Sequence, residues 1–405
     1  MNILENENPR RDFAAAVVAR LRESGHEAYW AGGCVRDILL GLEPTDYDVA
    51  TDARPEQVAG LFRRTVGVGV SFGVVKVLGP REAGEVEVAT FRSDGAYVDG
   101  RRPESIVFST PERDASRRDF TINGMFLDPL DGRVIDYVGG REDLRKKVLR
   151  AIGDPRARFG EDKLRLLRAV RFAARFRLSF DPETRLAIVE MARQVTAVSV
   201  ERIAQELRRM LVHPSRTEAM ALAAGLGLLE VILPSVGMPG TVHVLSALPA
   251  TSSFPLAFAA LLRDLAPQAV LDLSARLKLS NAERERTSWL VENQRALIDA
   301  PNLPRHLLKR LLASEGIADL LALHRAIALA DSSDVAHVAY CEAYLRDQPD
   351  GPIDPPPLLT GHDLARHGLR PGPRFATLLD ALRDAQLDGT VTTRDEALAF
   401  VDRAS

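Results

Sequence analysis

Two neighbouring stretches near the N-terminus constrain this chain most: a Gly-Gly turn and, shortly after it, a pair of aspartates. Gly32 and Gly33 have no Cβ, so the backbone of this turn can approach a bound ligand closely. Arg36 follows the turn, and its planar guanidinium is suited to phosphate oxygens. Asp46 and Asp48 stand two residues apart, which in a strand places both carboxylates on one face. Carboxylates forced together repel unless a cation such as Mg²⁺ lies between them. The stretch therefore indicates a phosphate site beside a metal site.

Composition narrows the class of protein. The chain has 405 residues, of which 46% are hydrophobic and 27% are charged, and this is typical of a globular protein with two to four domains. Its only two cysteines, Cys34 and Cys341, exclude a disulfide framework and a cysteine-rich zinc site, and they fit a reducing cytoplasm. The sequence has no apolar signal segment and no run of about 18 apolar residues, so we expect no membrane partner.

Charge is distributed unevenly along the chain. The formal net charge is −3, but residues 141–216 contain 19 Lys and Arg against 10 Asp and Glu, which gives this segment +9 and leaves −12 for the remainder. A basic segment inside an acidic chain indicates a surface that binds a polyanion such as a nucleic acid. Solvated helix faces without a ligand are the alternative explanation of this pattern.

The first 150 residues alternate between helical and strand patterns, which predicts an α/β region with a small, mainly antiparallel sheet. Asp131-Gly132 is a strong hairpin signal between strands at residues 125–127 and 134–137. Residues 92–103 are polar and contain glycine, which favours a mobile loop. We expect helices at residues 11–23, 35–40 and 55–64, and further strands at residues 28–30, 47–50, 73–78 and 85–91.

A third acidic group is available on a later strand. Glu85, Glu87 and Ala89 share one face of that strand. Of the two glutamates, Glu87 lies nearer the following turn, and it is the candidate to join Asp46 and Asp48. The alternative is an ordinary glutamate that faces solvent.

From Asp162 onward the pattern is helical. Asp162, Arg165, Arg168 and Arg171 recur every three residues, which on a helix forms a ridge that drifts slowly around the axis. An acidic and a basic residue at this spacing also describe an ordinary surface ion pair. Residues 351–357 contain four prolines and predict a stiff linker, after which a last helical piece follows.

Five motifs follow one another in the N-terminal half: Gly32–Asp37, Asp46–Asp48, Arg117–Met125, Glu161–Arg168 and Glu201–Ile203. Each is weak alone, but the five in this order are specific. Together they resemble the class II tRNA nucleotidyltransferase and bacterial poly(A) polymerase family. The resemblance implies an α+β fold, with a polymerase-β-like nucleotidyltransferase head that has a small mixed, largely antiparallel sheet, followed by an all-α neck, body and tail. It implies a head at residues 1–150, a neck at 151–217, a body at 218–350 and a tail at 351–405.

The resemblance also assigns roles to residues. It implies that Asp46 and Asp48 bind Mg²⁺ and that Glu87 is the third catalytic carboxylate. The implied reaction is attack of a tRNA 3′-hydroxyl on the α-phosphate of ATP or CTP with two-metal catalysis and release of pyrophosphate. We expect a cytoplasmic enzyme that acts as a monomer or a weak homodimer. The nucleotide-contacting residues implied are Gly33, Arg36, Arg118, Asp162, Arg165, Arg168 and Arg171, with further backbone donors around Gly32.

Hydrogen bonding explains how such a site could select bases without a template. Cytosine and adenine present an amino donor beside a ring-nitrogen acceptor, whereas uracil and guanine present a carbonyl acceptor beside an N–H donor. Asp162 can accept from the amino group while Arg165 donates to the ring nitrogen. This pair would accept C and A and reject U and G.

Several alternatives stay open. The loop at residues 92–103 is full length, which among members of this family favours addition of CCA, or of its terminal A alone, over addition of CC only. A poly(A) polymerase shares the chemistry, although its usual tail is more basic than this one. A catalytically silent RNA-binding protein is a third alternative, and the three carboxylates argue against it.

The predicted body contains a region that resembles a metal-dependent phosphohydrolase domain in degenerate form. Arg263 precedes Asp264 where some relatives have the histidine of a His-Asp pair. His324 could be a remnant of the same fold. We therefore expect a structural helical region without a His/Asp metal site.

Overall fold

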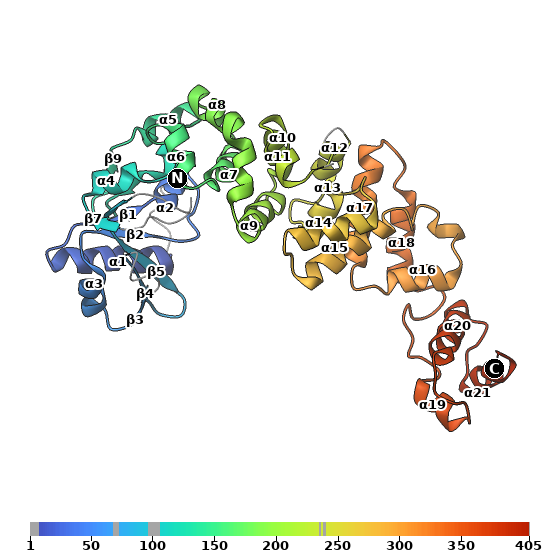
Figure 1. Ribbon diagram of the computed structural model, residues 1–405. Helices are drawn as coiled ribbons and strands as arrows, with labels where there is room; N and C mark the ends of the chain where they lie inside the picture. Colours follow the sequence, from blue (N-terminus) through green and yellow to red (C-terminus); the bar gives the residue numbers. More distant parts are fainter. Residues whose placement is uncertain (1–7, 68–72, 96–105, 235, 238–239, 405) are drawn as a thin grey trace. The chain divides into compact units, whose positions relative to one another are not determined.

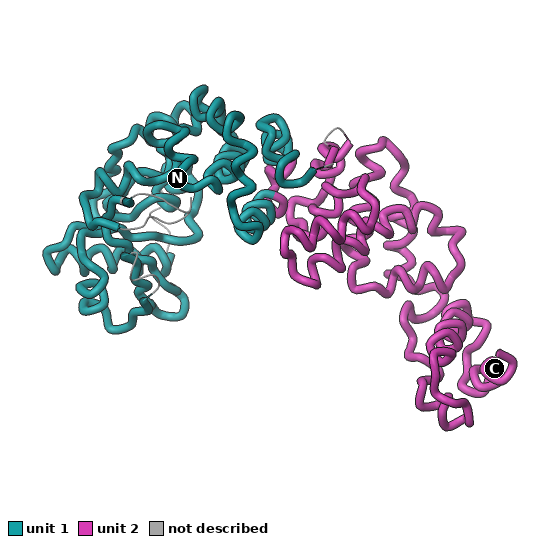
Figure 2. Tube along the Cα trace, in the orientation of Figure 1, with its two compact units in different colours: residues 1–210, 218–234 teal, residues 211–217, 235–405 magenta. Residues whose placement is uncertain are grey.

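The structure is a computed structural model, and it describes residues 8–67, 73–95, 106–234, 236–237 and 240–404. The chain forms two compact units, which Figure 2 distinguishes by colour: unit 1 comprises residues 1–210 and 218–234, and unit 2 comprises residues 211–217 and 235–405. The finer division into head, neck, body and tail stays a prediction. Most of the loop expected at residues 92–103 lies outside the described residues.

A seven-stranded sheet forms the centre of unit 1 (Figure 1). Its strands are β1 (Ala28–Ala31), β2 (Val49–Thr51), β3 (Thr65–Gly67), β4 (Val74–Leu78), β5 (Glu85–Thr90), β8 (Met125–Leu127) and β9 (Val134–Asp136). Their order across the sheet is β3-β4-β5-β2-β1-β8-β9. Neighbouring strands are antiparallel except β2 and β5, which run parallel. This arrangement confirms the mixed, largely antiparallel sheet and the hairpin around Asp131-Gly132.

The middle of the sheet is buried because its strands are almost entirely apolar. All four residues of β1 are buried, and the rings of Tyr29, Phe91 and Phe126 pack together with centroids 5.8 to 6.5 Å apart. Helix α1 (Pro9–Glu23) packs against β1, β2 and β5 and buries Val17 and Val18. This core holds in place the turn that follows β1 and the segment that precedes β2.

Most of the other described residues of unit 1 are helical. The last residue of α9 (Val200–Leu211) and the first two residues of α10 (Arg216–Gly225) belong to unit 2. The two-stranded pairs are β6 (Arg92–Asp94) with β7 (Ile106–Phe108), and β10 (Val148–Leu149) with β11 (Ser179–Phe180). β11 is a short exception in the predicted all-α neck. The helices are α2 (Gly33–Leu39), α3 (Pro55–Leu61), α4 (Pro111–Ser116), η2 (Thr121–Asn123), α5 (Gly140–Lys146), α6 (Pro155–Glu161), α7 (Arg165–Phe176), α8 (Pro182–Met191), η3 (Ala192–Ala197), α9 (Val200–Leu211), α10 (Arg216–Gly225) and α11 (Leu228–Ile232).

One expectation about α7 is wrong. The three-residue spacing predicts a helical ridge that begins at Asp162, but Asp162 has extended backbone (φ −145°, ψ 104°) after α6, and α7 begins at Arg165. The Asp162 carboxylate accepts a hydrogen bond from the Leu164 N–H (3.1 Å). Such a local bond from side chain to backbone competes with helical geometry, so Asp162 lies in a turn between two helices.

Within the described residues, unit 2 is all-α, as expected for the body and tail. Residues 359–401 have a hydrophobic cluster of their own around Leu364, Leu382 and Val401. No described helix of the chain is long and apolar enough to cross a membrane. The helices are α12 (Thr241–Ala247), α13 (Phe254–Leu261), α14 (Pro267–Arg276), α15 (Asn281–Asn293), η4 (Ala300–Asn302), α16 (Arg305–Leu312), α17 (Ile317–Ala330), α18 (Ala336–Asp347), α19 (Gly361–Arg366), α20 (Arg374–Asp388) and α21 (Arg394–Ala404).

Gly140, the first residue of α5, lies against the backbone of η2. A Cβ at this position would lie 2.2 Å from the carbonyl oxygen of Thr121, so Gly140→Ala must push α5 and η2 apart. We expect this change to lower the free energy of unfolding by about 1–3 kcal/mol, measured by urea denaturation.

Gly60→Ala is the matched control, because Gly60 is also helical and, among the described residues, nothing lies within 4 Å of an added Cβ. It should leave stability unchanged or raise it by up to about 1 kcal/mol. Equal losses in the two variants would contradict the close contact between α5 and η2.

Candidate active site

A cleft of about 640 Å³ in unit 1 brings the sequence motifs together. It lies where the Gly-Gly turn, the segment before β2, the residues around η2 and the start of α7 meet. Seven arginines and four aspartates line it, so the lining has a net charge of +3 and attracts phosphate groups. The lining residues are Gly32, Gly33, Arg36, Asp46, Asp48, Arg117, Arg118, Asp119, Asn123, Asp162, Leu164, Arg165, Arg168, Arg171, Phe172 and Arg202.

The two glycines of the turn have different structural roles. Gly32 has φ +73°, its N–H donates to the Met125 carbonyl (3.1 Å), and a Cβ there would lie 2.7 Å from Arg118 Nη1. Gly33 begins α2, and an added Cβ would lie 3.6 Å from Arg36 Nη2, an ordinary contact. Gly32 is therefore the one of the two positions at which both the backbone conformation and the available space require glycine. The Gly32 N–H is already used in a hydrogen bond within the protein.

The Asp-Tyr-Asp segment presents its two carboxylates to the cleft because the residue between them is buried. Tyr47 packs on Trp30 with ring centroids 4.8 Å apart, so the neighbouring Asp46 and Asp48 point away from the core. The backbone carbonyl of Asp48 accepts from the Ala31 N–H (2.9 Å), which fixes the segment beside β1.

Glu87 lies near this pair but does not line the cleft. Val49 pairs with Val88 in the parallel β2–β5 contact, so Asp48 and Glu87, one residue earlier on each strand, lie level and on the same face. The Glu87 side chain is 49% exposed and forms an ion pair with Lys76 Nζ (3.3 Å).

The electrostatics of the pair fit a divalent cation. Asp48 opens to the cleft, yet protein surrounds most of it, and this burial raises its pKa to about 6, with repulsion from Glu87 and Asp46 adding to the effect and Arg118 opposing it. A hard cation such as Mg²⁺ would relieve this repulsion, and carboxylate oxygens are its preferred ligands. In the described ranges no three His, Cys, Asp or Glu side chains converge as a ligand set. The residues that fit a metal are therefore Asp46 and Asp48, with Glu87 contributing its charge from the adjacent strand.

Arg36 is buried and satisfied by the protein. Its Nε and Nη2 donate to Asp37 (2.9 and 2.7 Å), and its Nη1 donates to Asn123 Oδ1 (2.6 Å). The guanidinium lies over the ring of Phe176, 4.3 Å from its centroid. Arg36 thus ties α2 to η2 and α7, and its contact with a ligand stays a prediction.

Arg118 is more open and lies beside the turn. Its Nε and Nη2 donate to Asp114 Oδ2 (3.3 and 2.9 Å), and its Nη1 donates to the Asn123 carbonyl (3.2 Å). Asp114 is buried, and Arg117 contacts its other oxygen (2.7 Å). The buried carboxylate aims both arginines, which places the edge of Arg118 against Gly32.

Asp162 and Arg165 do not pair with each other, so the alternative of a surface ion pair at this spacing is wrong. Arg165 contacts the Glu161 carboxylate and donates to the Arg158 carbonyl (2.7 Å). Asp162 instead accepts two bonds from Arg202 of α9, from Nη1 to Oδ1 (3.1 Å) and from Nη2 to Oδ2 (2.7 Å). Arg202 was not among the candidate site residues, although it lies within the Glu201–Ile203 motif.

The two other arginines of the predicted ridge also have acidic partners. Arg168 donates to Asp119 Oδ2 through Nε (2.8 Å) and Nη2 (2.5 Å), and Arg171 Nε donates to the buried Glu206 (2.6 Å). Burial alone would raise the pKa of Asp119, but Arg168 and a hydrogen bond from Asn123 hold it at about 2. All four residues of the ridge therefore lie at the cleft, each with a protein partner.

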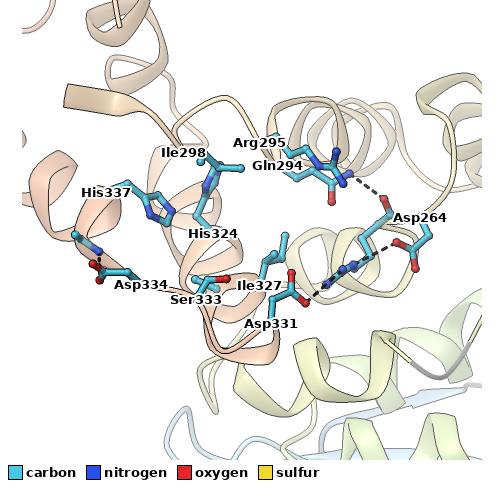
Figure 3. A pocket seen from close by; sticks show the side chains of 13 residues that line it. Asp264, Gln294, Arg295, Ile298, His324, Ile327, Asp331, Ser333, Asp334 and His337 are labelled. Atoms are coloured by element: carbon cyan, nitrogen blue, oxygen red, sulfur yellow. Dashed lines mark hydrogen bonds and ion pairs between the residues drawn. The ribbon is translucent and has the colours of Figure 1, made fainter. Parts of the chain in front are cut away.

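Figure 3 shows a second cleft, of about 490 Å³, in the part of unit 2 where the sequence predicts a degenerate phosphohydrolase-like region. His324 Nε2 donates to the Asn293 carbonyl (3.0 Å), and burial lowers the pKa of His324 to about 4. Arg263, at the position of the expected histidine, lies between Asp264 (3.3 Å) and Asp331 (3.8 Å). No metal-ligand group of three such side chains occurs in the part of the chain that the structure describes. We assign no catalytic role to this cleft.

The low pKa of Asp119 makes its contribution to stability depend on pH. Because the pKa in the folded state (about 2) is below the ordinary value of 3.8, the ionised carboxylate stabilises the fold by about 2 kcal/mol above pH 3.8, and this is lost as pH falls from 3.8 through 2. We expect the difference in unfolding free energy between wild type and Asp119→Asn to fall by about half between pH 5 and pH 3, measured by urea denaturation. A difference that stays constant over this range would contradict the strong pairing with Arg168.

Two family models match the chain. The poly A polymerase head domain matches residues 28–150, which include the turn, the three carboxylates and η2. The probable RNA and SrmB-binding site of polymerase A matches residues 177–237, which include α9.

Relatives of known name match much more of the chain. The CCA-adding enzyme of Lactobacillus johnsonii is 32% identical over 401 residues, which is 95% of this chain and 96% of that relative. The CCA-adding enzyme of Bacillus subtilis is 42% identical over 243 residues, 60% of this chain and 59% of that relative. Among solved structures, the Bacillus stearothermophilus CCA-adding enzyme in complex with CTP has a TM-score of 0.75 and 28% identity, with 98% of both chains covered. Because the Lactobacillus johnsonii match spans nearly the whole of both chains, this chain belongs to the family of CCA-adding enzymes.

Proposed function

We propose that this protein is a template-independent nucleotidyltransferase that adds C, C and A to the 3′ end of tRNA from CTP and ATP. The observation that carries the proposal is the cleft of about 640 Å³ in unit 1, in which the Asp46/Asp48 pair lies together with Asp162 and Arg165. The full-length similarity to CCA-adding enzymes supports the same function. The tRNA 3′-oxygen would bond to the α-phosphorus of the nucleotide, and the bond to the β-phosphate oxygen would break as pyrophosphate leaves.

Asp46 and Asp48 are the residues that would hold Mg²⁺. When bound there, the cation would favour deprotonation of the 3′-hydroxyl and offset the charge that develops on the leaving phosphate. Glu87 would add negative charge from the neighbouring strand, which strengthens attraction of the cation to the pair. Arg118 would neutralise the triphosphate beside the Gly32 turn.

Arg36 would act by holding other parts of the site in place. Because its guanidinium is used by Asp37 and Asn123, it would keep α2 and η2 in register with α7 while Arg118 faces the phosphates. The expected contact between Arg36 and the nucleotide stays a prediction. The positioning role follows from the burial of the Arg36 side chain.

Base selection would rest on Asp162 and Arg165. Asp162 would accept from the amino group of cytosine or adenine, and Arg165 would donate to the ring nitrogen beside it. In the structure each has a protein partner, Arg202 and Glu161 respectively, which orients the carboxylate and the guanidinium before a nucleotide arrives.

The RNA partner would be the acceptor end of tRNA in the cytoplasm. The match to an RNA-binding model at residues 177–237 overlaps the basic segment 141–216, which supports binding through phosphates and a loss of affinity at high salt. The expected monomer or weak homodimer stays a prediction.

Addition of A alone and poly(A) synthesis are the competing functions. The family model that matches the head is itself described as that of poly A polymerase. Poly(A) synthesis therefore stays a competing function. A silent RNA-binding protein would have no need of the Asp46/Asp48 pair in the lining of a positively charged cleft.

A primer-extension assay separates these functions. We expect radiolabelled tRNA that ends at the discriminator base, at C or at CC to be completed to CCA with CTP, ATP and Mg²⁺. Extension only of the CC form would instead mean addition of A alone, and long A tails on unrelated RNA would mean poly(A) synthesis. Asp46→Ala is the control, in which incorporation should be abolished while tRNA binding is largely kept. No incorporation by wild type would contradict both enzymatic functions.

Gly32→Ala tests the turn. The added Cβ would displace Arg118, so we expect kcat/KM for CTP and ATP to fall by roughly 100-fold, as expected when a phosphate-neutralising donor is misplaced.

Gly41→Ala is the matched control, because Gly41 has nearly the same φ (+72° against +73°) and, within the described residues, open space at its Cβ. Both variants place a Cβ at a positive φ, so both should lose stability, but Gly41→Ala should keep its activity. Similar activity in the two variants would contradict the proposed link between Gly32 and Arg118.

A further inference from the structure

Arg202 crosses from α9 to the turn that carries Asp162, a residue 40 positions earlier in the chain. Its two terminal nitrogens bind the two carboxylate oxygens separately, at 3.1 and 2.7 Å. Both side chains are mostly buried, with 21% and 16% exposed, and both line the cleft. A bidentate arginine fixes the plane of a carboxylate, which a single contact does not do.

Asp162 needs such a partner because helix geometry does not hold it. It has extended backbone between α6 and α7, and among the described residues its carboxylate accepts one other hydrogen bond, from the Leu164 N–H to Oδ1 (3.1 Å). A carboxylate on a turn with one backbone bond can rotate about its side-chain torsions. Arg202 removes that freedom.

Helix α9 has a second contact, with the middle of α7. Glu206 lies one turn after Arg202 on α9 and accepts from Arg171 of α7 (2.6 Å). The same buried carboxylate also accepts from Arg209 (2.9 Å). α9 thus binds the turn through Arg202 and the helix through Glu206, so the position of Arg202 is itself well defined.

We propose that Arg202 is a specificity-determining positioning residue, which holds the Asp162 carboxylate in the plane that accepts from the amino group of cytosine or adenine. The inference rests on the proposed function, because it concerns which nucleotide that reaction uses. Arg202 acts through Asp162 and need not touch the reacting atoms. Without it the carboxylate would be free to turn away, and a base with a carbonyl at this position would no longer be rejected.

The test compares kcat/KM for CTP against UTP on tRNA that ends at the discriminator base. Arg202→Gln should raise the KM for CTP and lower the CTP/UTP selectivity by at least about tenfold, as expected for loss of one charge-assisted bidentate contact. Arg185→Gln is the charge control, since Arg185 lies exposed on α8, outside the cleft lining, and should leave selectivity unchanged. Arg202→Lys, which keeps the charge but not the fork, should be intermediate.

A double variant shows whether Arg202 acts through Asp162. In an Asp162→Asn background, we expect the further change Arg202→Gln to leave selectivity unchanged, because the oriented carboxylate is already gone. Additive losses would overturn the proposal, as would Arg202→Gln with slower addition but wild-type selectivity, which would mean a purely structural contact. If Arg202→Gln fails to fold, as judged by thermal unfolding, Arg202→Lys decides, and wild-type selectivity in it would overturn the requirement for a two-point contact.

Failure of the inference is distinguishable from failure of the proposed function. If wild type adds C and A selectively but the Arg202 variants do so equally well, only the role of Arg202 is wrong. If wild type incorporates neither nucleotide, the proposed function is wrong and the inference with it.

Discussion

A continuous series of polar contacts connects the Gly-Gly turn to α7. Arg36 donates to the side-chain oxygen of Asn123 (2.6 Å), and the Asn123 nitrogen donates to Asp119 Oδ1 (3.0 Å). Arg168 binds the other oxygen of Asp119 twice. Each group would be costly to bury alone, so loss of any one would leave its neighbours unpaired. The series therefore sets how the Gly-Gly turn and the Arg36 side of the cleft lie relative to the α7 side.

Pairing of charged groups also explains how seven arginines can lie around one cleft. Mutual repulsion is offset because acidic groups from other elements lie between them: Asp119 with Arg168, Glu206 with Arg171, Glu161 with Arg165 and Asp162 with Arg202. A net positive charge nevertheless remains at the lining. Preorganised donors of this kind can meet a triphosphate without a large rearrangement, which is the main advantage of a folded site over water.

Several parts of this arrangement could be predicted because they depend on local pattern. Alternation places Asp46 and Asp48 on one side of a buried Tyr47, and an Asp-Gly pair predicts the β8–β9 hairpin. The surroundings of Glu87 depend on more than its own strand. Its strand and face were predictable, but its level relative to Asp48 depends on the parallel register of β2 and β5, and its ion pair with Lys76 depends on β4. A residue pattern along one strand does not specify the neighbouring strand.

The order of residues indicates a phosphate site beside a metal site, followed by a basic helical segment suited to a polyanion, and the resemblance carried by the five motifs implies nucleotidyl transfer. The order of residues does not establish which charged groups pair. The spacing of Asp162 and Arg165 suggests one local pair, whereas the fold gives Asp162 a partner 40 residues away. That choice was made by the packing of α9 against the α6–α7 turn. Arginine and aspartate can pair in many combinations of similar energy, so only the three-dimensional placement of their backbones selects among them.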